Sequence, residues 1–210
     1  MDIQNENGVE RREVLKGGLK LGAAAGLAAM VLGVNKTGGQ VFAQTPDAPF
    51  KNDIDVLNYA LTLEFFEAEL YKTLIGLGKL QGKDLQYVQL FGQQEQAHVD
   101  TVKTVIEKLG GTPVQKGQYN FGAAGPINNR DDVLKVLATV EQVGVSAYLG
   151  AAGYIQNADL LAAAASIMQV EARHTAVIRG LAGQFPVPAA FTPALTPAEV
   201  LKIVTPFFKA

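Results

Sequence analysis

The chain of 210 residues contains no cysteine and no tryptophan, and it has only two histidines. The lack of cysteine excludes disulfides, thiolate nucleophiles, iron–sulfur clusters and cysteine-linked lipids, so any metal must be bound by oxygen and imidazole ligands. The formal charge is only −2, and no basic cluster in the body of the chain indicates a nucleic-acid partner. A chain of this length is expected to form one domain with a well-buried core, together with an appendage.

The N-terminus has the pattern of a targeting signal. Arg11 and Arg12 precede an apolar run at residues 19–34, which is shorter than the roughly 20 residues needed to span a bilayer. This pattern resembles a bacterial twin-arginine (Tat) signal. We therefore expect cleavage after Ala43, a mature chain that starts at Gln44 without a stable membrane span, and export to the periplasm or cell envelope.

Four longer segments have apolar residues at the spacing of three and four that is typical of α-helices, and no strand pattern is found. The connection after the second segment is about 18 residues long and starts at Gly110, whereas the other two connections are only a few residues each. Short links join antiparallel neighbours, and a long one can run the length of a bundle. We therefore predict an all-α, antiparallel four-helix bundle with one long crossover. The predicted helices cover residues 54–75, 85–109, 134–155 and 160–181.

The domain boundaries follow from these patterns and from composition. Asp53 is a plausible N-cap for the first helix, and Thr196 and Glu199 flank Pro197 as in a capped helix. This second pattern predicts a short C-terminal helix that ends near Val204. The predicted parts are a signal at 1–43, a linker at 44–52, the bundle at 53–182 and a proline-rich tail at 183–210.

Each predicted helix of the bundle carries one charged residue on its apolar face, and in all four helices it is a glutamate. In the second and fourth helices the glutamate is followed three residues later by a histidine, and these are the only histidines of the chain. The two helical pairs therefore repeat the same order, Glu and then E-x-x-H. The six residues are Glu64, Glu95, His98, Glu141, Glu171 and His174.

This pattern predicts a site for two metal ions. Burying one unpaired carboxylate costs on the order of several kcal/mol, and four together also repel one another. Two divalent cations would balance the four negative charges, and protonation of the carboxylates is the inexpensive alternative. Each E-x-x-H helix can give one metal an oxygen and a nitrogen, and Glu64 and Glu141 can then bridge or chelate. Such mixed ligands suit iron, manganese or zinc.

Four helices, one long crossover and the order Glu, E-x-x-H, Glu, E-x-x-H resemble the ferritin-like di-iron and di-manganese carboxylate proteins. The stretches Ala60–Tyr71, Glu141–Gly150 and Val170–His174 are most similar to exported ferritin-like domain proteins that include desiccation-related proteins. The resemblance implies two bound metal ions, expected to be iron with manganese or zinc as alternatives, that react with dioxygen or peroxide. A homo-oligomer is neither required nor excluded by it.

Three further side chains are candidates for supporting the metal ligands. Tyr71 and Tyr148 each lie seven residues after a ligand glutamate, where similar bundles hold tyrosines near the metals; the alternative is ordinary core packing with a satisfied hydroxyl. Bacterioferritins place an acidic residue just before each E-x-x-H glutamate to orient the opposite histidine. Here those positions are Gln94, which can accept a hydrogen bond, and Val170, which cannot.

Other charged and small residues are expected to have structural roles. Glu67 and Glu69 lie off the apolar face of the first helix and are expected to be solvated, although Glu67 is within reach of the site. The alanine-rich stretch at residues 160–165 is expected to be closely packed between helices.

The sequence is compatible with two functions, and with a third interpretation in which no metal is bound. The first is an exported di-metal protein of the oxidoreductase type, acting in ferroxidase chemistry, iron storage or peroxide detoxification. The absence of cysteine removes the second iron centre of rubrerythrins, which argues against efficient multiple-turnover peroxidase activity. The alternative is a non-catalytic envelope protein that protects against desiccation or stress, with a structural metal. The third is a metal-free bundle with protonated carboxylates.

Overall fold

The computed structural model describes residues 49–209, and within them the structure is helical, with one isolated β-bridge between Tyr119 and Phe208. The predicted all-α architecture is confirmed. The predicted signal segment and residues 44–48 of the predicted linker lie outside the described residues. The helices are α3 (Asp53–Gly76), α4 (Gly82–Lys108), η1 (Phe121–Ala124), α5 (Arg130–Ala152), α6 (Ala158–Leu181), α7 (Pro197–Val204) and η2 (Thr205–Phe207).

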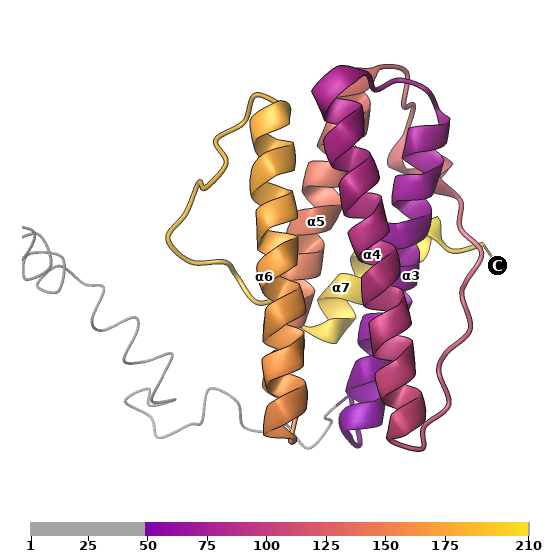
Figure 1. Ribbon diagram of the computed structural model, residues 1–210, viewed down its shortest axis with the longest axis vertical. Helices are drawn as coiled ribbons and strands as arrows, with labels where there is room; N and C mark the ends of the chain where they lie inside the picture. The colour runs from indigo at the N-terminus through magenta and orange to yellow at the C-terminus, as the bar shows by residue number, and fades with distance from the viewer. Residues whose placement is uncertain (1–48, 210) are drawn as a thin grey trace, which may run out of the picture. The chain divides into compact units, whose positions relative to one another are not determined.

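The four long helices form a bundle of two antiparallel hairpins, α3 with α4 and α5 with α6 (Figure 1). The segment between α4 and α5 runs along the outside of the bundle from one end to the other, so α4 and α5 point in the same direction. This is the predicted long crossover. Within residues 49–209 no helix is both long enough and apolar enough to cross a membrane.

Side-chain caps mark the start of three of the four bundle helices. The amide oxygens of Asn52, Asn129 and Asn157 accept hydrogen bonds from backbone N–H groups in the first turns of α3, α5 and α6. Asp53, the predicted cap of the first helix, is instead its first residue. Its carboxylate accepts hydrogen bonds from the backbone of the α5–α6 loop, at 2.7 Å from Gln156 N and 3.0 Å from Asn157 N.

The C-terminal tail is fastened to the bundle through its backbone. The predicted cap is present, because Thr196 and Glu199 form a reciprocal capping box at the start of α7. Just before it, the N–H of Leu195 donates to the carbonyl of Ser146 at 3.0 Å. The absence of a side chain at Gly150 permits this approach, since a Cβ there would lie 1.8 Å from the Leu195 carbonyl oxygen.

The end of the tail also pairs with the crossover. The N–H of Asn120 donates to the carbonyl of Phe207 at 2.6 Å, and the N–H of Lys209 donates to the carbonyl of Gln118 at 2.9 Å. Phe66 of α3 is fully buried beneath this pairing, among aromatic rings whose centroids lie 5.5–6.3 Å from its own. This cluster closes one face of the bundle without using any residue of the predicted metal site.

Candidate metal centre

The six glutamate and histidine residues predicted as ligands meet in the interior of the bundle. Each of the four long helices contributes, and the four glutamates and His174 are at most 1% exposed. His98 is slightly more open, with 12% of its side chain exposed. Their ligand atoms form two compact groups, the first from Glu64, Glu95, His98 and Glu171 and the second from Glu95, Glu141, Glu171 and His174.

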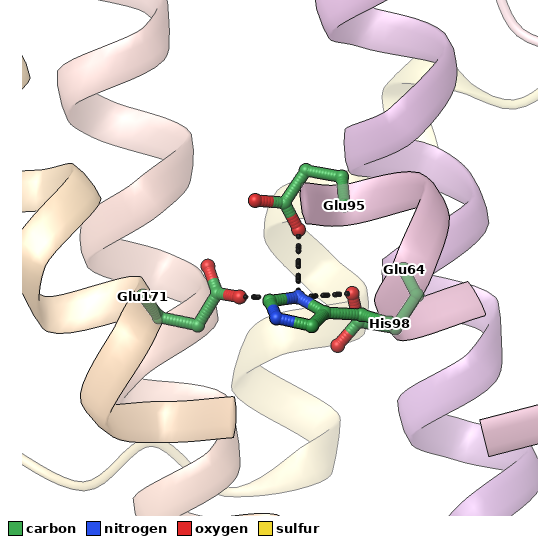
Figure 2. Close-up of side chains that lie close together, drawn as sticks. All are labelled: Glu64, Glu95, His98 and Glu171. Atoms are coloured by element: carbon green, nitrogen blue, oxygen red, sulfur yellow. Dashed lines mark hydrogen bonds and ion pairs between the residues drawn. The ribbon is translucent and has the colours of Figure 1, made fainter. Parts of the chain in front are cut away.

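The first group is centred on the ring of His98. Its Nδ1 atom lies 3.0 Å from Oε1 of Glu171, 3.2 Å from Oε2 of Glu95 and 3.4 Å from Oε2 of Glu64. Figure 2 shows these three carboxylates converging on the imidazole from three different helices. The donor set is one nitrogen and three carboxylates, which is suited to iron, manganese or zinc.

The second group repeats this arrangement around His174. Its Nδ1 atom lies 2.8 Å from Oε1 of Glu95, 3.5 Å from Oε2 of Glu141 and 3.9 Å from Oε2 of Glu171. Glu95 and Glu171 therefore direct one oxygen into each group, whereas Glu64 and Glu141 each belong to one. The sequence left open whether Glu64 and Glu141 bridge or chelate, and in the structure it is the E-x-x-H glutamates that belong to both groups.

The two tyrosines contact the carboxylates that belong to a single group. The hydroxyl of Tyr148 donates to Oε1 of Glu64, and the hydroxyl of Tyr71 donates to Oε1 of Glu141. Each hydrogen bond occupies the outer oxygen and leaves the inner Oε2 directed at the centre. Both tyrosines therefore hold a carboxylate in place in addition to packing in the core.

The two histidines differ in how their rings are held. Nε2 of His174 lies 2.6 Å from Oε1 of Gln94, so this N–H donates to the amide and leaves Nδ1 facing the carboxylates. The ring of Phe91 also stacks on His174 with centroids 4.2 Å apart. At the corresponding position on α6, Val170 offers no acceptor. Within residues 49–209 no group forms a hydrogen bond to Nε2 of His98.

Burial and charge shift the pKa values across this cluster. Burial raises the pKa of Glu64 to about 7, and it also raises the pKa values of Glu141 and, more strongly, Glu171. Burial would raise the pKa of Glu95 as well, but its hydrogen bonds to both histidines outweigh burial and lower it. Burial opposes charge on His98, yet the surrounding carboxylates raise its pKa to about 12.

The same balance acts on the second imidazole, whose pKa rises to about 10 because Glu141 and Glu95 outweigh burial. In the metal-free protein these raised pKa values favour the protonated imidazoles, which would neutralise part of the carboxylate charge. The sequence reasoning considered only protonated carboxylates as the alternative to metal. That expectation was incomplete, because the imidazoles also carry protons.

A fifth carboxylate lies in the same core, although the sequence predicted it to be solvated. Glu67 is only 4% exposed, and burial followed by repulsion from the other glutamates raises its pKa well above the usual range. Its Oε1 atom occupies space next to Gly144 of α5, where an added Cβ would lie 2.7 Å away. The signal that could have revealed it is a mid-helix glycine three residues after Glu141, matching Glu67 three residues after Glu64.

Several atoms of the centre are buried without any hydrogen-bond partner. Buried polar atoms in proteins almost always have one, so a concentration of oxygens and nitrogens that have only ion-pair contacts with one another fits a cation-binding site. The donor sets of both groups could hold metal ions. The atoms are Oε2 of Glu64, Oε1 of Glu95, Oε2 of Glu141, both carboxylate oxygens of Glu171 and Nδ1 of His174.

A family model for the ferritin-like domain matches residues 52–184, which is more than half of the chain. The chain belongs to the ferritin-like domain family. No curated protein matches the chain.

Two solved structures have a fold similar to this ferritin-like protein. One is a conserved hypothetical protein, rv2844, from Mycobacterium tuberculosis, with 18% identity and a TM-score of 0.56; the match covers 65% of this chain and 94% of that one. The other is the hypothetical protein MJ0754 from Methanococcus jannaschii DSM 2661, with 18% identity and a TM-score of 0.51, covering 78% of this chain and 98% of that one. At this identity the two structures support the fold alone.

The pKa shifts predict opposite pH dependences for the metal-free and metal-loaded protein. Glu64, His98 and His174 have pKa values raised above their unfolded values, so they stabilise the metal-free fold at low pH. That stabilisation is lost as pH rises through the folded values, and only Glu95, with its lowered pKa, opposes the trend. Bound metal competes with protons for the same atoms, so loaded protein is destabilised by acid. Melting temperatures of chelator-treated and loaded protein should diverge as pH rises from about 5 to about 8.

The control for this prediction is the double variant Glu64→Gln with Glu141→Gln. The amides can still accept hydrogen bonds from Tyr148 and Tyr71, so the fold should be kept. Because two titrating carboxyl groups are removed, much of the pH dependence of the metal-free protein should disappear, and metal binding should weaken. Equal melting temperatures for chelated and loaded protein across the pH range would show that the cluster is not compensated by metal.

Proposed function

We propose that this ferritin-like protein binds two divalent metal ions, with iron favoured, and that the loaded centre reacts with dioxygen or peroxide. The observation that carries the proposal is the pair of donor groups that share Glu95 and Glu171, each completed by one histidine and one further glutamate. Each ion would be held by one imidazole and three carboxylates. Together, four carboxylates balance the charge of two divalent ions.

Reduction of dioxygen requires electrons, which the bound metal ions would supply. Two ferrous ions held by the ligand residues would supply the two electrons that, with two protons, reduce dioxygen to hydrogen peroxide. The chain itself holds protons close to the centre, on the hydroxyls of Tyr71 and Tyr148 and on Glu67, whose raised pKa favours the protonated acid. The chain has no cysteine and therefore no cysteine-ligated second iron centre, so external reductant would be needed for repeated turnover.

A second function is a protective protein of the cell envelope, acting in desiccation or stress, in which the metal only stabilises the bundle. The burial of the centre favours this alternative, because four of the carboxylates and one imidazole are almost completely enclosed. A structural metal would stabilise the fold whatever its redox chemistry, so zinc would serve as well as iron.

The location of the protein outside the cytoplasm is part of the proposal and rests on Arg11, Arg12 and the apolar run that follows them. The Tat resemblance implies transport of folded cargo, which suits a protein that acquires metal before export. The matching test replaces both arginines by lysine and fractionates the cells. Export should be lost, and unchanged delivery outside the cytoplasm would contradict a twin-arginine signal.

Metal stoichiometry gives a direct prediction about the two donor groups. Anaerobic titration with cobalt(II), followed by its visible absorption, should show two ions per chain. Glu141→Ala should weaken one position, because Glu141 belongs to one group only, whereas Glu95→Ala should weaken both.

Glu69→Ala is the matched control, since Glu69 forms surface ion pairs with Lys72 and Lys116 and lies outside both groups. It should bind two ions like the wild type. A wild-type protein that binds one ion or none, or indistinguishable effects of Glu141→Ala and Glu95→Ala, would contradict the shared-carboxylate arrangement.

Oxygen consumption separates the two functions. Protein loaded anaerobically with two ferrous ions should consume one dioxygen for two irons oxidised when mixed with aerated buffer. A protective protein would keep its iron ferrous under these conditions, while zinc raised its melting temperature as much as iron. That pair of results would replace the oxidoreductase proposal with the structural one.

A further inference from the structure

The two helical hairpins are related by a nearly constant shift along the sequence. A shift of 77 residues carries Glu64 onto Glu141 and Tyr71 onto Tyr148, and a shift of 76 residues carries the first E-x-x-H onto the second. Each residue of one hairpin therefore has a counterpart in the other. The core layers on the two sides of the metal centre can be compared position by position.

The layer next to His174 is filled by large side chains. Phe91 stacks on the imidazole, and three aliphatic residues around it, Leu74, Val88 and Leu137, are fully buried. Close packing of this kind leaves little room for another molecule.

The layer next to His98 has a smaller residue at each of these four positions. The counterparts of Phe91, Leu74, Val88 and Leu137 are, in order, Ile167, Ala151, Ala164 and Ala60. All four of these smaller residues line a cavity of about 50 Å³ between the helices. The expectation that the stretch at residues 160–165 is closely packed was wrong, because Ala162 and Ala165 are exposed and Ala164 faces this cavity.

The cavity lies one helical turn from the metal centre. Ala60 is one turn before Glu64, Val102 is one turn after His98 and Ile167 is one turn before Glu171, and all three line the cavity. Tyr148 also lines it, and the hydroxyl of this tyrosine donates to Glu64. The cavity is therefore next to the more exposed of the two histidines, whose Nε2 no side chain holds.

The chemistry of the lining restricts what can occupy the cavity. It contains no charged side chain, and apart from Tyr148 and Thr101 every lining residue is aliphatic. The pocket opens to solvent at Thr101 and Ala163, which are exposed, and its apolar lining favours a small apolar molecule such as xenon over a charged or strongly hydrogen-bonding one. The volume of about 50 Å³ fits a molecule of a few atoms.

We propose that this cavity, lined by Ala60, Ala151, Ala164 and Ile167, binds dioxygen and delivers it to the His98 side of the metal centre. Delivery to the metals rests on the proposed function, whereas binding of a small apolar gas does not. Hydrogen peroxide is polar, and an unpaired polar molecule is disfavoured in an apolar cavity, so peroxide would reach the centre by another route.

Xenon tests the binding part of the proposal without any metal chemistry. A crystal of the protein pressurised with xenon should show the gas between α4 and α6, next to Tyr148 and Ile167. The variants Ala60→Leu and Ile167→Phe give each position the residue of its counterpart and should abolish xenon binding there. Ala162→Leu adds the same volume as Ala60→Leu at an exposed position of α6 and should leave xenon binding intact.

Oxidation kinetics test the delivery part with the same variants. Ferrous-loaded Ala60→Leu and Ile167→Phe should react with dioxygen several-fold more slowly than wild type, while their rates with hydrogen peroxide and their cobalt(II) spectra stay unchanged. Because the two substitutions lie on different helices, the second decides the result if the first fails to fold.

Three outcomes would overturn all or part of the proposal. Absence of xenon from the cavity would overturn the binding site. Equal dioxygen rates in Ala60→Leu and Ala162→Leu, despite loss of xenon from the former, would overturn delivery. Wild-type protein that binds xenon but never oxidises its iron would overturn delivery together with the proposed function, and it would support the cavity as a gas site.

Discussion

The constraint on which this structure depends is the compensation of buried carboxylate charge at the middle of a helical bundle. Glu67 and the four ligand glutamates are nearly inaccessible to solvent, and within residues 49–209 no lysine or arginine pairs with them. Without metal, the two imidazoles supply positive charge, and the carboxylates hold them protonated. Metal ions would have to displace these protons, so protons and metal ions compete to neutralise the same buried carboxylates.

The repeated hairpin explains how a short chain builds two equivalent donor groups. Glu and E-x-x-H occur at nearly the same spacing in both halves, and the pairing of the hairpins places two glutamates between two histidines. The repeat is broken at positions that support the centre. Gln94 holds His174 where Val170 leaves His98 unsupported, and Glu67 faces Gly144. Because of these differences, the ring of His174 is held by a hydrogen bond and is buried, whereas the ring of His98 lacks that support and is more exposed to solvent.

The sequence was sufficient for features that one helix determines alone. The three- and four-residue spacing predicted the helices and the inward position of Glu64, Glu95, Glu141 and Glu171, and the capping pattern at Thr196 predicted α7. The length of the connection after the second helix predicted the crossover. The sequence was insufficient where two helices determine the result together. Glu67 is buried only because α5 presents a glycine opposite it, and Ala162 is exposed only because the first half of α6 is incompletely covered. Bridging by Glu95 likewise depends on the distance between hairpins, which periodicity does not specify.

The interactions that hold the bundle together are separate from those that need metal. The aromatic cluster around Phe66, the asparagine caps and the backbone pairing of the C-terminal tail involve none of the ligand residues. The donor atoms already converge in the metal-free structure, so binding does not require the helices to assemble around the ions. A preformed centre reduces the ordering that metal binding must impose. It would also allow the protein to fold and bind metal before the export in the folded state that we propose.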